Sequence, residues 1–139
     1  MHRLLEWCGL DEVDLSSAWI EAVAVEFQLD ADQSQAAALM ARRILQGEGA
    51  WAWQGKEIGW HGNEVPVCVH GRVGRIDRLV QRRDGQWWVL DYKSATQPQA
   101  QTELLEQLRG YRAAVRASYP DAPVRAAFLS ASGALEEIE

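Results

Sequence analysis

The stretch Trp87–Lys93, WWVLDYK, decides the fold, because four apolar residues run directly into an acid, an aromatic residue and an amine. A continuous apolar run of this kind is typical of a strand that is buried on both faces. Side chains alternate along a strand, so Asp91 and Lys93 are expected on one face. Leu90 and Tyr92 are expected on the other face. Charged groups are costly to bury unless they are paired, bind a metal or are used in chemistry, and the strand end is therefore the candidate functional site.

A second acid, Asp77, lies in the segment GRIDRL that precedes this strand. The pair Asp84-Gly85 between the two segments is typical of a β-hairpin. A two-residue turn would set Asp77 opposite Tyr92 and send the two aspartates to opposite faces. A three-residue loop ending at Gly85 would set Asp77 opposite Asp91, and glycine suits the left-handed conformation at the third loop position. The sequence permits both arrangements.

If the two aspartates share a face, their negative charges repel, and a divalent cation relieves the repulsion. Carboxylate oxygens favour Mg²⁺ or Mn²⁺, and such an ion polarises a phosphate and lowers the pKa of bound water. Lys93 could then orient the water or offset charge in the transition state. This chemistry fits phosphodiester hydrolysis. The simpler alternative is an ion pair between Asp91 and Lys93 with Asp77 in a turn, because Asp-x-Lys is common by chance.

Length and composition predict one globular domain, since the chain has 139 residues with 47% apolar and 24% charged residues. We expect no membrane span, because no run approaches 18 apolar residues. The N-terminus lacks the pattern of a signal peptide. Cys8 and Cys68 have no metal-binding spacing, and we therefore expect a reduced, cytoplasmic setting.

The net charge of −6 argues against a general nucleic-acid binder, but the charge is unevenly distributed. Residues 1–64 hold 4 basic and 11 acidic side chains, whereas residues 65–135 hold 10 basic and 6 acidic side chains. The basic part includes the candidate site and could attract phosphates locally. Chance asymmetry of a solvated surface is the alternative.

The order of elements predicts a mixed α/β domain. Residues 1–47 are expected to be helical, with Asp30 and Gln33 at capping-box spacing and Gly47 at the helix end. Residues 50–93 are expected to form a meander of three or four strands, in which 50–60 and 64–71 are separate strands. A helix over 101–117 and a final strand over 124–130 complete the domain.

Five short motifs, taken in order, resemble the PD-(D/E)xK nucleases, and more narrowly the RecB/AddA-type nuclease domain at the C-terminus of UvrD-like helicase–nucleases. The motifs cover essentially the whole chain. They are HRLLEW from His2, NEVPV from Asn63, GRID ending at Asp77, WWVLDYKS around Asp91, and the Gln-x-x-x-Tyr pair Gln107 and Tyr111. The resemblance implies a restriction-endonuclease-like α/β core, with a mixed β-sheet flanked by helices and an N-terminal helical segment.

The resemblance also implies the roles of the site residues. His2, Asp77, Asp91 and the backbone carbonyl of Tyr92 would bind Mg²⁺ or Mn²⁺. Lys93 would be the catalytic lysine. Gln107 and Tyr111, one helical turn apart, would position the lysine, the water or a DNA phosphate.

Each of these residues also has a structural alternative. His2 could be a frayed terminal residue, Tyr111 a core residue and Gln107 a solvated one. Glu64 is a weaker candidate, more typical of a surface strand. The arginines of the strand region could contact phosphates, but alternation lets only some of them do so; they are Arg72, Arg75, Arg78, Arg82 and Arg83. Three tryptophans could stack on single-stranded bases: Trp51, Trp53 and Trp60.

By resemblance, the chain is a deoxyribonuclease, expected to act as an exonuclease, from a larger bacterial helicase–nuclease that processes DNA ends in recombinational repair. The expected partners are DNA, the helicase domain of the parent chain and a partner subunit. No Gly-x-x-x-x-Gly-Lys-Ser/Thr phosphate loop occurs in the chain, so the helicase would lie outside it. The alternatives are a catalytically silent nuclease-like module that binds DNA or a partner subunit, and a nuclease that acts on RNA.

Overall fold

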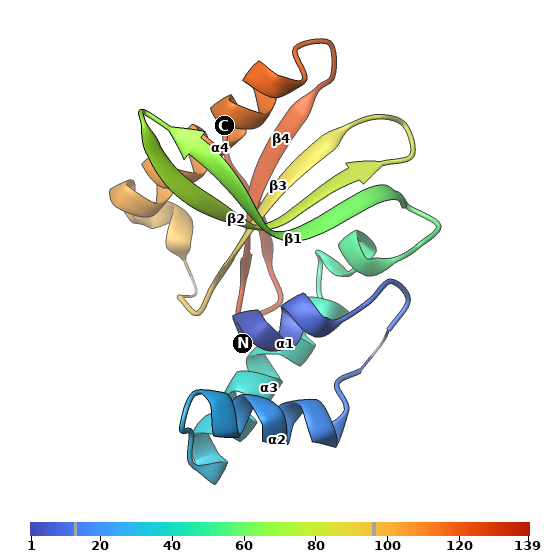
Figure 1. The fold of residues 1–139 in the computed structure, drawn as a ribbon, viewed down its shortest axis with the longest axis vertical. Coiled ribbons are helices and arrows are strands. Elements are labelled where there is room, and N and C mark those ends of the chain that lie inside the picture. The colour runs from blue at the N-terminus through green and yellow to red at the C-terminus, as the bar shows by residue number, and fades with distance from the viewer. Residues whose placement is uncertain (13, 96) are drawn as a thin grey trace.

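The computed structural model describes residues 1–12, 14–95 and 97–139. Its centre is a five-stranded mixed sheet in the order β1-β2-β3-β4-β5 (Figure 1). The strands are β1 (Ile58–Val69), β2 (Arg72–Arg82), β3 (Trp87–Lys93), β4 (Val124–Ser130) and β5 (Leu135–Glu137). The helices are α1 (His2–Trp7), α2 (Ser17–Glu26), α3 (Ala31–Gln46) and α4 (Thr102–Ser118), with short 3₁₀ helices η1 (Ala50–Trp53) and η2 (Pro98–Ala100). The expected mixed sheet flanked by helices, with an N-terminal helical segment, is confirmed.

The register of the β2–β3 hairpin decides where the aspartates lie. Arg78 pairs with Leu90 in an antiparallel ladder, and this register corresponds to a three-residue loop. Gly85 takes the left-handed conformation at the third loop position, with φ +92°. The same register, continued by one residue, sets Asp77 opposite Asp91. Of the two alternatives that the sequence left open, the three-residue loop is therefore the one observed.

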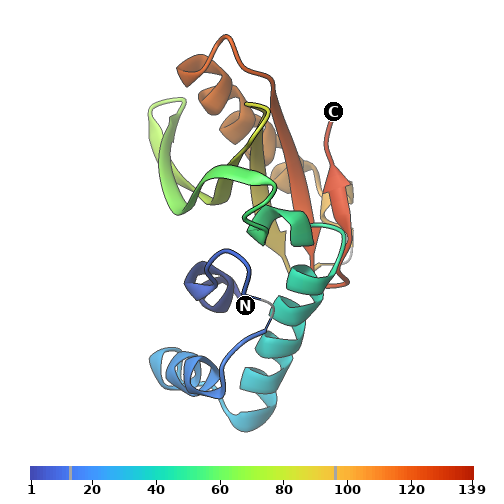
Figure 2. The same ribbon diagram turned by 90° about the vertical axis from the view of Figure 1, so that its right-hand side faces the viewer.

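The two faces of β3 pack against different helices. Trp88, Leu90 and Tyr92 belong to the core formed with α1, α2, α3 and η1. Trp87 and Val89 belong to the core formed with α4. The N-terminal helices gather below the sheet in Figure 1, and Figure 2 shows α4 on the opposite side of the sheet from α3. The end of β3 therefore lies where the two layers meet the sheet.

The crossover between β3 and β4 makes this part of the sheet parallel. Trp87 pairs with Val124 and Lys93 with Ser130. Parallel neighbours need a long connection, and α4 supplies it. Leu108, Tyr111 and Val115 form the buried stripe of α4, as its spacing predicts.

The outer half of the β1–β2 hairpin projects beyond the rest of the sheet. The β2–β3 register begins at Arg78, so residues 65–69 and 72–76 pair with each other and with no other strand. We call these two segments the arm; it lies beside α4 in Figure 1. β1 is an edge strand that contains Pro66, and Glu64 at the base of the arm has a left-handed φ of +51°.

Two details of the predicted meander, and the expectation that the strand over 124–130 is the last, were wrong. Residues 50–53 form a 3₁₀ helix, because Trp53 turns inward and stacks on Tyr92 with ring centroids 6.0 Å apart. The segments 50–60 and 64–71 are not two strands, since one strand, β1, runs from Ile58 to Val69. The strand over 124–130 is confirmed but is not the last, because β5 follows it.

The helix predictions agree with the structure. The capping box of Asp30 and Gln33 is present, and α3 ends at its C-cap Gly47. None of the helices in the described ranges is long and apolar enough to cross a membrane.

Candidate metal and phosphate site

The two aspartates meet at the ends of β2 and β3. The backbone N–H of Tyr92 donates a hydrogen bond of 2.8 Å to Asp77 Oδ2. The side chains of Asp77 and Asp91 lie close enough for a hydrogen bond between them, and Asp91 is only 4% exposed. The patch of two carboxylates that the sequence permitted is therefore formed.

His2 approaches the acids from α1. Its Nε2 lies 3.2 Å from Asp77 Oδ2, and its ring centroid lies 5.5 Å from that of Tyr92. The fully buried Leu4 and Leu5 hold this short helix against the core. The His2 side chain remains 47% exposed, so the imidazole faces the acids on one side and solvent on the other.

The three titratable groups shift one another's pKa. Burial raises the pKa of Asp91 to about 7; the hydrogen bond and charge of Asp77 act in the same direction and Lys93 opposes them. Burial would also raise the pKa of Asp77, but hydrogen bonds with His2 and Asp91 outweigh it and leave this pKa below its ordinary value. The hydrogen bond to Asp77 raises the pKa of His2. Carboxylates this close share a proton, or a cation between them.

Lys93 completes the charged group. Its Nζ lies 3.2 Å from Asp91 Oδ2, which is an ion-pair distance. Asp91 Oδ2 is buried, and the Lys93 ammonium is the polar neighbour that the structure places beside it. A carboxylate oxygen can accept more than one partner, so an oxygen held by a single ion pair keeps the capacity to bind a further ligand.

The chemistry of these donors fits a divalent cation, although their present spacing does not close around one. Within residues 1–12, 14–95 and 97–139, no group of three or more His, Cys, Asp or Glu side chains is placed to hold an ion. The donors meet in pairs: His2 with Asp77, and Asp77 with Asp91. Two carboxylates and an imidazole nevertheless match the ligand preference of Mn²⁺ and Mg²⁺, and Asp91 Oδ2, next to Lys93, can accept a further ligand.

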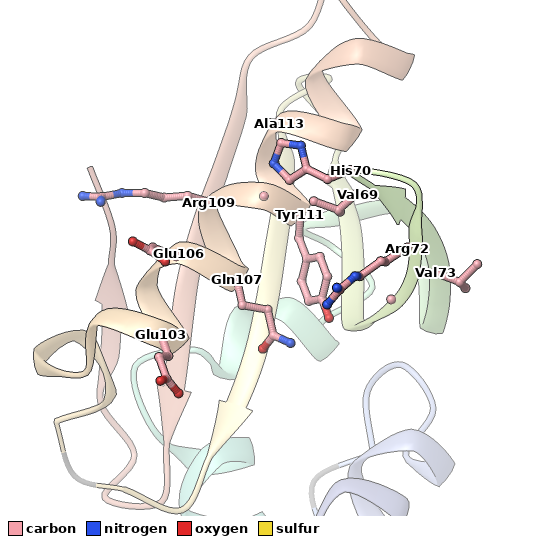
Figure 3. Close-up of a pocket in the computed structure, with 12 residues that line it drawn as sticks. Val69, His70, Arg72, Val73, Glu103, Glu106, Gln107, Arg109, Tyr111 and Ala113 are labelled. Atoms are coloured by element: carbon pink, nitrogen blue, oxygen red, sulfur yellow. The ribbon is translucent and has the colours of Figure 1, made fainter.

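Gln107 and Tyr111 lie on α4 and line a groove of about 980 Å³ between this helix and the arm (Figure 3). Tyr111 packs so tightly on β2 that a Cβ at Gly74 would lie 2.8 Å from its ring. Burial raises the pKa of Tyr111, and the charge of Asp91 raises it further. Tyr111 is buried against β2 at the groove, whereas Gln107 is exposed at the groove wall.

Glu64 comes closer to the site than its sequence suggested. It falls opposite Asp77 in the β1–β2 register and lines a pocket of about 370 Å³ with His2 and Arg75. Burial raises its pKa, and the charge of Asp77 acts in the same direction. Its left-handed backbone is uncommon for a residue with a side chain, and such strain is concentrated at functional sites.

The structure divides the five arginines considered for phosphate binding. Arg72 and Arg75 are exposed beside the groove and the smaller pocket. Arg82 is paired with Glu57, and Arg83 donates to the Gly55 carbonyl.

Two of the sequence-based candidates for ligand contact were wrong. Arg78 is fully buried, so it does not contact a phosphate. Trp53 is 2% exposed and is not available to stack on a base, whereas Trp60 is 46% exposed.

The family model of the PD-(D/E)XK nuclease superfamily matches residues 1–137, and the chain belongs to this superfamily. No curated protein matches the chain. Members of the superfamily generally hydrolyse nucleic acids and typically use Mg²⁺ or another divalent metal.

Proposed function

We propose that the chain is a metal-dependent nuclease domain that hydrolyses DNA phosphodiester bonds. One observation carries the proposal: Asp77 and Asp91 face each other, and His2 and Lys93 each lie 3.2 Å from one of their carboxylate oxygens. The superfamily assignment supports the same reaction class.

In this proposal His2, Asp77, Asp91 and the Tyr92 carbonyl hold Mg²⁺ or Mn²⁺. A bound ion would act as a Lewis acid on the phosphate and lower the pKa of water at the site. The Tyr92 N–H would fix the orientation of the Asp77 carboxylate through its hydrogen bond to Oδ2. The proton that Asp91 holds up to a pH of about 7 would be displaced by the ion.

The residues around the acids would bind and orient the phosphate. The Lys93 ammonium beside Asp91 would donate to a phosphate oxygen and offset the charge that develops there. Tyr111, held by its packing on Gly74, would direct its hydroxyl toward the same phosphate. Gln107 lies one helical turn away from Tyr111 and would contact the next phosphate along the DNA strand.

The groove beside the arm gives the substrate a place to lie. It contains apolar surface for sugars and bases, including Val69 and Val73, and a cation, Arg72. Glu103 and Glu106 on the opposite wall would keep the backbone on the Arg72 side. The smaller pocket, which His2 and Arg75 line, would receive the part of the DNA strand on the other side of the cleaved phosphodiester bond.

The sequence resemblance extends the proposal to a biological setting. On this ground we propose that the domain belongs to a bacterial, cytoplasmic helicase–nuclease that degrades DNA from its ends during recombinational repair. The helicase of the parent chain would feed the strand to the site, and a partner subunit would complete the assembly. Weak activity of the isolated domain is expected, because the feeding motor is separate.

The test is a cleavage assay on plasmid DNA, single-stranded DNA and an RNA of matched sequence, each with Mg²⁺, Mn²⁺ or EDTA. It compares the wild-type protein with Asp91→Asn. The control variant is Asp121→Asn, because Asp121 is exposed. Metal-dependent cleavage should fall by about a thousandfold in Asp91→Asn and stay unchanged in the control. Equal cleavage by Asp91→Asn would refute the assigned site.

Two other results would favour the competing functions. Absence of both cleavage and Mn²⁺ binding would favour the silent module that binds DNA or a partner subunit. Faster cleavage of the RNA than of the DNA would change the assigned substrate.

A further inference from the structure

Arg78, next to Asp77 in β2, is a buried cation whose position needs an explanation. Its side chain is 0% exposed, and no ion pair joins it to any acid in the described ranges. Its Nε and Nη2 donate to the Ala52 carbonyl at 3.2 and 2.8 Å, and its guanidinium lies 4.6 Å from the Trp53 ring centroid. A buried charge is a poor source of stability compared with an apolar residue of the same size. A role for Arg78 in fixing the relative positions of the elements that it contacts is the better explanation.

The remaining contact of Arg78 leads to the helix that carries His2. Arg78 Nη1 donates to Asn63 Oδ1 at 2.9 Å, and Asn63 Nδ2 donates to the Glu6 carbonyl at 3.2 Å. A continuous chain of hydrogen bonds therefore joins η1, β2, β1 and α1. It runs from the Ala52 carbonyl through Arg78, the residue after Asp77, to the Glu6 carbonyl in the last turn of the helix that begins at His2.

The Asn63 contact acts at the weakest point of α1. This helix has six residues and no side-chain cap at its N-terminus. Helices this short are unstable without tertiary contacts, and the carbonyls of the last turn have no partner within the helix. The Glu6 carbonyl is one of these, and Asn63 satisfies it. Leu4 and Leu5 press the helix against the core, whereas the hydrogen bond to Asn63 is directional.

We propose that Arg78 and Asn63 are positioning residues that fix α1 on the sheet, so that the His2 imidazole is held at Asp77. The inference rests on the proposed function, in which His2 and Asp77 are metal ligands. Arg78 holds the Asn63 amide in one orientation, since its N–H occupies the amide oxygen and leaves the NH₂ group to face Glu6. The amide oxygen could otherwise turn toward the helix carbonyl and repel it.

Asn63→Asp separates this role from folding. The aspartate keeps an acceptor for Arg78 and lacks the donor for the Glu6 carbonyl. Gln81→Ala is the matched control, because Gln81 is also a partly buried strand amide that donates to a backbone carbonyl, that of Gly85, away from α1.

Two measurements are made on each full-length protein. The first is hydrogen exchange of the α1 amides in EDTA, which does not depend on bound metal. The second is the Mn²⁺ concentration for half-maximal cleavage, measured together with the rate at saturating Mn²⁺.

Asn63→Asp should accelerate α1 exchange about fivefold, since one hydrogen bond is lost. It should raise the half-saturating Mn²⁺ concentration about tenfold, as removal of a residue that supports a metal ligand does. The rate at saturating Mn²⁺ should stay within about twofold of wild type. His2→Ala should raise the Mn²⁺ requirement at least as much, and Gln81→Ala should change neither quantity.

Normal α1 exchange in Asn63→Asp, or a lower saturated rate with an unchanged Mn²⁺ requirement, would overturn the positioning role while leaving the nuclease proposal intact. If the wild-type protein neither binds Mn²⁺ nor cleaves, the proposed function fails, and the positioning inference fails with it.

Discussion

The acid pair makes a strong prediction for Asp91→Asn in the absence of metal: removing a proposed ligand should stabilise the protein at neutral pH. Burial raises the pKa of Asp91 from 3.8 to about 7. The folded state therefore retains a proton that the unfolded state has lost, and stability falls as the pH rises from about 4 to about 7. Asparagine imitates the protonated acid and avoids this loss.

The size of the effect follows from the pKa shift. A gap from 3.8 to about 7 corresponds to about 4 kcal/mol, at 1.36 kcal/mol per pH unit. Because Asp77 and Asp91 titrate together, this figure is an upper bound for the single substitution. At pH 7.5 we expect the free energy of unfolding of Asp91→Asn to be about 2–4 kcal/mol higher than that of the wild-type protein. At pH 4.5 we expect the two free energies to be similar.

The assay is urea unfolding in EDTA at both pH values, with Asp121→Asn as the exposed control. When the unfolding is repeated with excess Mn²⁺, the difference in free energy of unfolding between Asp91→Asn and the wild-type protein should become smaller or change sign. The reason is that an ion that binds only the folded wild-type protein stabilises that protein. A mutant that is less stable than wild type at pH 7.5 in EDTA, or a stability difference that is the same at both pH values, would refute the reasoning.

Four further substitutions test the site and its supports. Lys93→Met should lower cleavage at saturating Mn²⁺ by about a hundredfold without raising the Mn²⁺ requirement, measured on single-stranded DNA; an unchanged rate would remove the lysine from the chemistry. Arg72→Gln should weaken DNA binding, measured by fluorescence anisotropy, and should reduce the slope of log affinity against log salt concentration by about one. An unchanged slope would show that the DNA strand lies outside the groove. Gly74→Ala should lower the free energy of unfolding by about 1–3 kcal/mol and reduce cleavage, since the added Cβ meets the Tyr111 ring. A wild-type free energy of unfolding for this variant, measured by urea unfolding, would contradict the prediction. Arg78→Met should leave the free energy of unfolding within about 1 kcal/mol of wild type while the Mn²⁺ requirement rises, whereas a loss of about 3–5 kcal/mol would show that the fold itself needs the cation.

The sequence predicted those parts of the fold that local chemistry determines. The α3 capping box requires only Asp30 and Gln33, three residues apart. The hairpin loop requires a glycine that can adopt a positive φ, and Gly85 supplied it. The faces of β3 followed from alternation, which places Asp91 and Lys93 together.

The parts that the sequence could not predict depend on tertiary contacts. The tryptophans of Ala50–Trp53 fit a strand pattern, but burial of Trp53 beside Tyr92 favours a 3₁₀ helix. β5 is three residues long, too short for a periodic signal, and forms because β4 offers it an edge. The break expected between segments 50–60 and 64–71 is absent because β2 is long enough to pair along β1 from Ile58 to Val69.

The same limit applies to the site. Alternation predicted that Asp91 and Lys93 share a face, whereas the hairpin loop left the face of Asp77 open and only the family resemblance implied that it joins them. The observed register brings the three residues together. Their ligand and catalytic roles stay predictions. Asn63 gave no signal, because an amide near a strand centre is interpreted as a turn residue and its partner in α1 is 57 positions away. Arg78 was one of five arginines considered for phosphate contact, since nothing local shows that Ala52 and Trp53 fold over it.

The outer edge of the sheet also affects how copies of the protein behave toward one another. A strand of 12 residues at an edge would offer a long row of free amides and carbonyls, which promotes aggregation. Pro66 removes one amide donor from β1, and the left-handed Glu64 bends the strand and brings a charge to its middle. Of these two interruptions, Glu64 is the one near the acid pair. The same irregular backbone that brings Glu64 toward Asp77 therefore makes this edge a poor template for a second chain.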